Sequence, residues 1–129
     1  MAERGFTPIS VEPIFLGTPL SAGDSSTSRA IDLRYSAQQG MFSLHSKVSS
    51  GTAGTCGTTV FTYSLSTSLN GDYVTPPSAV SIGTSGTSAA ESVMSFEPEM
   101  MPFMKVIATQ TGSGTAGFDS KINAELIIQ

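Results

Sequence analysis

The C-terminal segment of this chain, residues 94–129, constrains the fold most strongly, because two of its parts alternate apolar and polar residues. These parts are residues 103–111 and 121–128, and residues 112–117 between them are all Gly, Ser, Thr or Ala. Alternation with a period of two is typical of a β-strand that buries one face. We therefore expect a β-hairpin here. Its apolar face would consist of Met104, Val106, Ala108, Ile122, Ala124, Leu126 and Ile128.

Shorter alternating segments upstream predict the strands that cover this face. Residues 31–35 and 41–48 alternate in this way, and so do residues 58–66, which we expect to pair with 41–48 as a second hairpin. The inner positions of this hairpin would be Phe42, Leu44, Ser46, Val48, Thr59, Phe61, Tyr63 and Leu65. Weaker strand signals follow at residues 73–75, 79–82 and 93–96. The expected fold is all-β, an antiparallel β-sandwich or jelly roll of about seven or eight strands.

The N-terminal residues 1–29 differ from the rest, and we interpret them as an extended arm on a β-sandwich domain formed by residues 30–129. Pro8, Pro13 and Pro19 prevent a helix or a central strand from running through this segment. Its apolar side chains are too numerous for a freely solvated tail: Phe6, Ile9, Val11, Ile14, Phe15 and Leu16. The arm would pack either on the domain's own sheet, as an edge strand and loop, or on a neighbouring subunit.

A second candidate contact region is a cluster of methionines at residues 94–104, around the connection between two expected strands. Four methionines lie there, close in sequence to Pro98 and Pro102: Met94, Met100, Met101 and Met104. Consecutive residues of an extended chain point to opposite sides, so Met100 and Met101 cannot both enter the core. Methionine suits adaptable contact surfaces. We therefore take Met100 and Met101, with the six apolar residues of the arm, as candidate protein-interface residues.

Charge and cysteine content exclude several classes of partner. The formal net charge is −4, and the six Lys and Arg residues are scattered, whereas nucleic-acid binding needs clustered cations. We expect no direct nucleic-acid contact and, for the same reason, no anionic membrane surface as a partner. The first twenty residues do not read as a signal peptide, and no apolar run approaches a membrane span. With its single cysteine, the chain is expected to fold in a reducing cytoplasm.

Residues that carry chemistry are few. Residues 112–117 match G-x-G-x-x-G, but this nucleotide-binding pattern requires a helix after it, and the following residues alternate as a strand. His45 shares its expected outward face with Ser43 and Lys47, so we interpret it as a surface histidine. Cys56 lies in a Gly/Thr loop without an adjacent cation. We expect no catalytic, cofactor or metal site and a protein that is not an enzyme.

Five short motifs carry a resemblance to known proteins: IDL at 31–33, MFSL at 41–44, FTYSLS at 61–66, NGDYVTP at 70–76 and PFMKV at 102–106. With these motifs, residues 30–129 resemble a group of small all-β proteins encoded among the structural genes of tailed bacteriophages and prophages. The resemblance implies a virion component without a cofactor, most specifically a capsid decoration (cement) protein. It would be made in the host bacterial cytoplasm and bind the major capsid protein or other virion proteins on the capsid exterior.

The same resemblance implies a homo-oligomer, with a trimer favoured. An acidic domain would be repelled by packaged DNA, which agrees with an outer position. Two alternatives remain open: a tail or neck protein of the virion, and a carbohydrate-binding module. Sugar platforms rely on exposed aromatic rings, and this chain has no Trp and only Tyr35, Tyr63 and Tyr73, two of which we expect to face inward.

Overall fold

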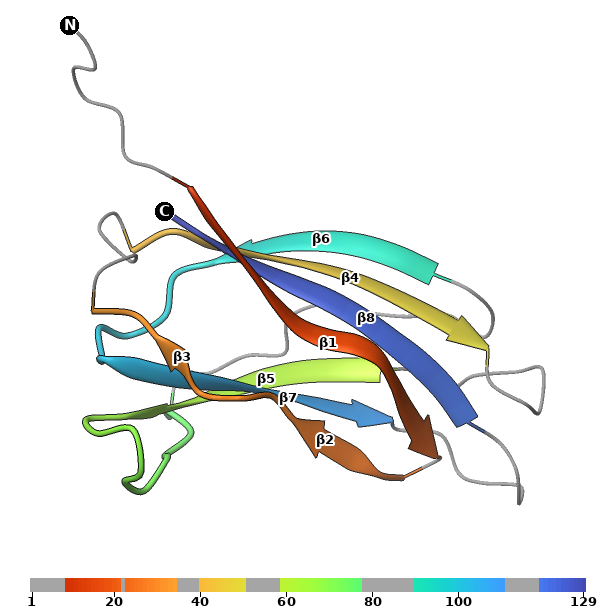
Figure 1. Cartoon of the computed structure of the whole chain (residues 1–129), viewed down its shortest axis with the longest axis horizontal. Coiled ribbons are helices and arrows are strands. Elements are labelled where there is room, and N and C mark those ends of the chain that lie inside the picture. Colours follow the sequence, from red (N-terminus) through yellow and green to blue (C-terminus); the bar gives the residue numbers. More distant parts are fainter. Residues whose placement is uncertain (1–8, 22, 35–39, 51–58, 78–89, 111–118) are drawn as a thin grey trace, which may run out of the picture.

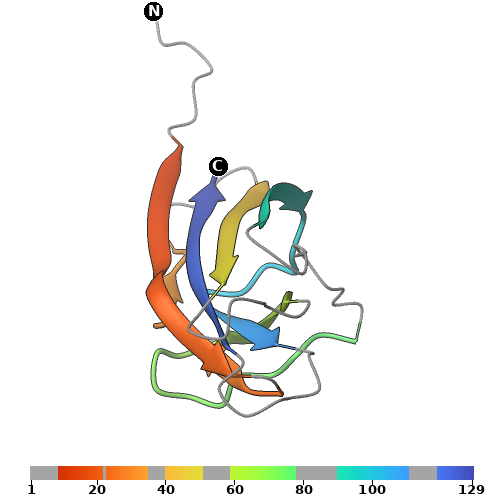
Figure 2. The ribbon, with the colours of Figure 1, turned by 90° about the vertical axis from the view of Figure 1, so that its right-hand side faces the viewer.

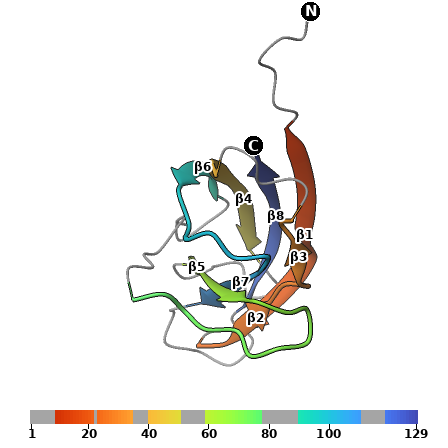
Figure 3. The ribbon, with the colours of Figure 1, turned by 90° about the vertical axis from the view of Figure 1, so that its left-hand side faces the viewer.

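The computed structural model of the chain describes residues 9–21, 23–34, 40–50, 59–77, 90–110 and 119–129, and these residues form eight strands and no helix. The strands are β1 (Ser10–Ser21), β2 (Ser25–Thr27), β3 (Ile31–Asp32), β4 (Phe42–Ser50), β5 (Thr59–Ser66), β6 (Ala90–Phe96), β7 (Phe103–Gln110) and β8 (Asp119–Ile128). They make two antiparallel four-stranded sheets packed as a sandwich (Figures 1 and 3). The predicted all-β sandwich is therefore confirmed.

The two sheets have different layouts. In the first sheet the order is β1-β8-β4-β6, so β8 and β4 are central and β1 and β6 form the edges. Figure 2 shows β1, β8 and β4 side by side in this layer. In the second sheet β5 pairs with β7 along its whole length, and β2 and β3 share the opposite side of β7.

Both predicted hairpins are wrong, although their strands are present. β7 and β8 lie in different sheets, and so do β4 and β5. Eight residues separate the members of each pair, at 51–58 and at 111–118. Tight hairpins have loops of about two to five residues, so connections of this length leave the chain free to cross to the other sheet. The alternation defines which face of a strand is buried, but not which strand lies beside it.

The predicted inner faces are confirmed. Each of the seven apolar residues chosen on β7 and β8 is at most 2% exposed, and the two sets belong to opposite layers of the core. The inner positions of β4 and β5 are buried as well. Aromatic contacts join the sheets: the ring centroids of Phe15 and Phe61 are 6.3 Å apart, and those of Tyr63 and Phe96 are 5.4 Å apart.

The described part of the N-terminal segment, from residue 10 to residue 21, packs on the chain's own sheet, as in the first of the two alternatives. β1 pairs with β8 from Ser10 to Ser21, with register shifts on both sides of Phe15 and Leu16. Gly17 has a positive φ of 65°, which suits a bulge, and its N–H donates to Asn123 Oδ1 at 2.9 Å. Because β1 is an edge strand, Pro13 and Pro19 are tolerated within it.

Some weaker expectations have mixed outcomes. Around residues 73–75 only an isolated bridge forms, between Val74 and Leu65. The strand expected at 93–96 begins earlier, at Ala90. The strand expected at 79–82 lies outside the described residues, as do Phe6, Tyr35, Cys56 and the glycine-rich residues 112–117.

Candidate protein interface

The structure divides the eight predicted interface residues into three groups. Four are strongly exposed: Ile9 at 60%, Val11 at 51%, Leu16 at 78% and Met100 at 72%. Ile14 and Phe15 are buried in the chain's own core, and Met101 is half-buried against it. Phe6 lies outside the described residues. The side chains of Ile14 and Phe15 are therefore not accessible to a second molecule, and the interface hypothesis narrows to the exposed group.

The bulged geometry of β1 explains this division. In a regular strand, consecutive residues such as Ile14 and Phe15 would point to opposite faces. The register shift between Pro13 and Phe15 breaks the alternation, and both side chains turn toward the core. The alternation of apolar and polar residues could not have predicted this, because it does not show where the register of β1 shifts.

Four apolar side chains gather at one end of the outer face of the first sheet. Val11 on β1 lies directly opposite Ile127 on β8, so their side chains share a face. Ile9, Met41 and Ile127 line one open hollow of about 370 Å³ together with Phe42 and Phe96. Its polar lining residues are Ser43, Ser95, Glu97 and Gln129. The start of β1 and the end of β8 meet at this end of the sheet (Figure 2). We call Ile9, Val11, Met41 and Ile127 the outer patch.

Two members of the outer patch were not among the predicted interface residues. Met41 was expected to point outward from its strand, and it is 55% exposed. Ile127 follows the buried Leu126, so the alternation already placed it on the outer face. Both residues could therefore have been found from the sequence, as apolar residues at positions expected to face outward. The exposed Met100 lies near Gly40, the residue before Met41, because its sulfur is 3.8 Å from the position that a Cβ on Gly40 would take.

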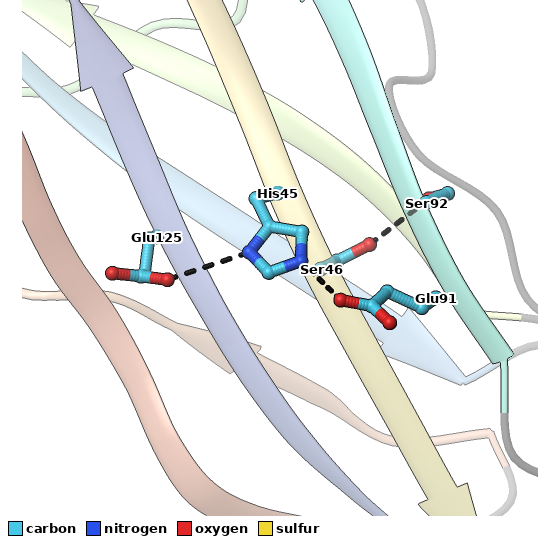
Figure 4. A network of polar contacts seen from close by, with 5 residues as sticks. All are labelled: His45, Ser46, Glu91, Ser92 and Glu125. Carbon is cyan, nitrogen blue, oxygen red and sulfur yellow. Dashed lines mark hydrogen bonds and ion pairs between the residues drawn. The ribbon is translucent and has the colours of Figure 1, made fainter.

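A polar network lies on the same outer face, farther along the strands. His45 on β4 stands between Glu91 on β6 and Glu125 on β8 (Figure 4). Its Nε2 is 2.6 Å from Glu91 Oε2, and its Nδ1 is 3.4 Å from Glu125 Oε1. The outward position of His45 was predicted, with a side chain that is 33% exposed. Its partners were missed, because they come from strands whose pairing with β4 the sequence does not define.

This arrangement favours a protonated histidine. A neutral imidazole has one N–H, whereas donation to both carboxylates requires the two N–H groups of the imidazolium. Hydrogen bonding to Glu91, and secondly to Glu125, raises the pKa of His45 above its ordinary value of 6.5. The contact with His45 lowers the pKa of Glu91 below 4.5, and Lys47 adds a smaller effect in the same direction.

The network offers little to catalysis or metal binding. The two carboxylates contact opposite sides of the imidazole ring and do not converge on one point (Figure 4). Within the described part of the chain, no group of three or more His, Cys, Asp or Glu side chains is placed to hold a metal ion. The arrangement is that of a cross-strand ionic contact on a sheet surface.

The two described tyrosines make internal contacts. The Tyr63 hydroxyl is buried and donates to Glu99 Oε1 at 3.0 Å, and burial, followed by this carboxylate, raises the pKa of Tyr63 to about 12. The Tyr73 ring is half-buried and is covered by the Lys105 ammonium at 4.3 Å from its centroid. Neither ring is presented as a free stacking surface.

A helix long and apolar enough to cross a membrane does not occur in the residues that the structure describes. No family model matches this chain, and no curated protein matches it either.

Proposed function

We propose that this chain is a non-enzymatic structural protein of a tailed-bacteriophage virion, and most specifically a capsid decoration protein. The observation that carries the proposal is the outer patch, in which Ile9, Val11, Met41 and Ile127 gather on one end of a sheet. The sequence resemblance is the argument for a virion protein. The outer patch is the surface through which the chain would contact a neighbouring protein.

Three properties support this role. The sandwich fold is the architecture that the resemblance implies. The net charge of −4 suits a position away from packaged DNA. Met100 is 72% exposed and lies near Gly40, beside the outer-patch residue Met41 in the sequence, and its flexible side chain would adapt well to a partner surface. The proposed partner is the major capsid protein or another virion protein, and the proposed assembly is a homo-oligomer, with a trimer favoured.

Burial of the outer-patch side chains against a partner protein would contribute favourable binding free energy. Full burial of a valine, isoleucine or methionine side chain contributes about 1.5 to 3 kcal/mol relative to exposure. Interfaces commonly depend on a few such side chains near their centre. Val11 is the best single probe, because it is half-exposed and contributes no buried side chain to the core.

Capsids that lack the protein, from the phage that encodes it, provide the test. Val11→Ser should weaken binding of the purified protein to these capsids about tenfold, by removal of one apolar contact of roughly 1 to 2 kcal/mol. The matched control is Val74→Ser, at a valine that is 64% exposed and pairs with β5 of the other sheet. Equal binding of the two variants would refute the role of the outer patch. Failure of the unaltered protein to bind would refute the decoration role itself.

The alternatives predict different results. A tail or neck protein would occur as a single ring in each particle, whereas a decoration protein would follow the capsid lattice in many copies. A carbohydrate-binding module would require exposed rings, and Tyr63 and Tyr73 are both engaged within the chain. Clear hits on a glycan array would favour that alternative.

A further inference from the structure

The edge strand β6 is held weakly by its own side chains. Between residues 91 and 96, where side-chain burial is described, Glu91, Val93, Met94 and Ser95 are exposed, and Ser92 and Phe96 are partly buried. β6 pairs with β4 alone, and its other edge pairs with no described strand. Few buried apolar contacts are the mark of a segment that opens locally before the whole protein unfolds.

The contacts between β6 and β4 change in kind along the strand. At the C-terminal end of β6, the ring of Phe96 packs against Phe42, with centroids 5.5 Å apart. At its N-terminal end, the described side-chain contacts are polar: Glu91 with His45 at 2.6 Å, and the Ser46 and Ser92 hydroxyls at 3.2 Å (Figure 4). Beyond its backbone pairing with β4, the attachment of this N-terminal end therefore includes a contribution from charge.

We propose that His45, in its protonated form, is a pH-dependent clamp that fastens the N-terminal end of β6 to the central strands β4 and β8. One imidazolium joins three strands, because it sits on β4 and meets a carboxylate from each neighbour. When the ring loses a proton, it keeps one N–H and can donate to only one of the two carboxylates, and the contact that remains is no longer an ion pair. The side-chain link across the three strands is then weakened, and the N-terminal end of β6 is held mainly by its backbone pairing with β4.

The pH range of the clamp follows from the two partners. His45 has a raised pKa, so its contribution is complete below 6.5 and is lost as the pH rises through the higher value of the folded state. Glu91 has a lowered pKa, so its contribution is complete above 4.5 and is lost as the pH falls through the lower folded value. The clamp is therefore fully closed between about pH 4.5 and 6.5 and opens toward alkaline pH.

The other groups around the His45 ring do not reverse the pH dependence of its contact with Glu91. Lys47, on the same strand, lies opposite Glu91 and helps to hold that carboxylate in its charged form. On the β1 side, the neighbours that line the hollow of about 260 Å³ beside His45 are uncharged: Pro13, Phe15 and Leu16. From β8, Asn123 and Ala124 are neutral, so Lys47 and Glu125 are the charged neighbours of His45 that line this hollow. The His45 side chain is 33% exposed, so its proton can exchange with solvent.

The first test is an NMR titration of the imidazole nitrogens of His45. In the unaltered protein the titration midpoint should lie above 6.5. Glu91→Gln should lower this midpoint more than Glu125→Gln, because the Glu91 contact is 2.6 Å and the Glu125 contact is 3.4 Å. Glu97→Gln is the matched control, since it removes the same charge just beyond β6 and should leave the midpoint unchanged. A midpoint at or below 6.5 in the unaltered protein would overturn the proposal.

The second test measures opening of β6 directly, by amide hydrogen exchange in the unaltered protein and in Glu91→Gln. At about pH 5.5, β6 amides should exchange about two- to fivefold faster in the variant, a ratio typical of an exposed ion pair. At about pH 9 the ratio should fall toward one, because loss of the His45 proton has then removed the ion pair with Glu91 from the unaltered protein as well. Amides of β7, in the other sheet, serve as the internal reference and should not differ. The same ratio for β6 at both pH values, or an equal change in β7, would contradict the clamp.

Discussion

Phe15 and Leu16 are adjacent on β1, and the structure predicts opposite results when each is replaced by alanine. Phe15 is 2% exposed, and its ring contacts Phe61 of the other sheet at 6.3 Å. Leu16 is 78% exposed on the outer face. Phe15→Ala should therefore destabilise the fold strongly, whereas Leu16→Ala should change stability little. The pair tests whether β1 is a structural part of the sandwich or a detachable arm.

The expected magnitudes follow from burial. A buried phenylalanine removes roughly 150 to 250 Å² from water, which at about 25 cal/mol per Å² corresponds to roughly 4 to 6 kcal/mol, part of which alanine retains. Loss of the ring contact with Phe61 adds about 1 kcal/mol. The net cost of Phe15→Ala should be about 3 to 5 kcal/mol, in the usual range for buried phenylalanine. Leu16→Ala should cost less than about 0.5 kcal/mol.

Urea unfolding, followed by tyrosine fluorescence or circular dichroism, measures both values. A loss of about 3 to 5 kcal/mol is a large part of the stability of a domain of this size, so Phe15→Ala could unfold outright. Phe15→Leu keeps most of the apolar volume and should cost about 1 kcal/mol, which keeps the test quantitative. Equal, small effects of Phe15→Ala and Leu16→Ala would refute the packing of β1 described above.

Two further substitutions test buried polar contacts. Ser28→Ala should cost about 1 to 3 kcal/mol in urea unfolding, because the Ser28 hydroxyl accepts the Val106 N–H at 2.9 Å in the buried interior and alanine leaves that donor unpaired; an unchanged midpoint would contradict this. Tyr63→Phe removes the hydrogen bond to Glu99 and should cost about 1 kcal/mol, and in the unaltered protein the Tyr63 phenol should titrate near pH 12 by ultraviolet absorbance. An ordinary midpoint near pH 10 would show that this hydroxyl is not held as described.

The faces of the strands could be predicted from the sequence, because alternation is a local property. Leu44 on β4 and Leu126 on β8 were assigned inward, and both are fully buried. Pairing could not be predicted, since it depends on how connections of eight residues cross between sheets. The same limit concealed the partners of His45, because Glu91 and Glu125 reach it only through the order β8-β4-β6.

The exposure of the candidate interface residues was predicted correctly for only some of them. Ile9 and Val11 were chosen because the N-terminal segment is too apolar for a solvated tail, and Met100 because it cannot enter the core together with Met101; all three are exposed. Ile14 and Phe15 belong to the same apolar segment, but the irregular register of β1 turns both inward. Ile127 was not among the candidates, although the alternation of its strand already placed it on the outer face.

Direct imaging of virions of the encoding phage by cryo-electron microscopy tests the central claim most directly. The account predicts density for this sandwich at repeated positions on the capsid exterior, with the outer patch around Val11 and Ile127 against a neighbouring protein. Absence of the protein from the particle would contradict the proposed function, and a sandwich attached through another surface, with the outer patch open to solvent, would contradict the proposed interface.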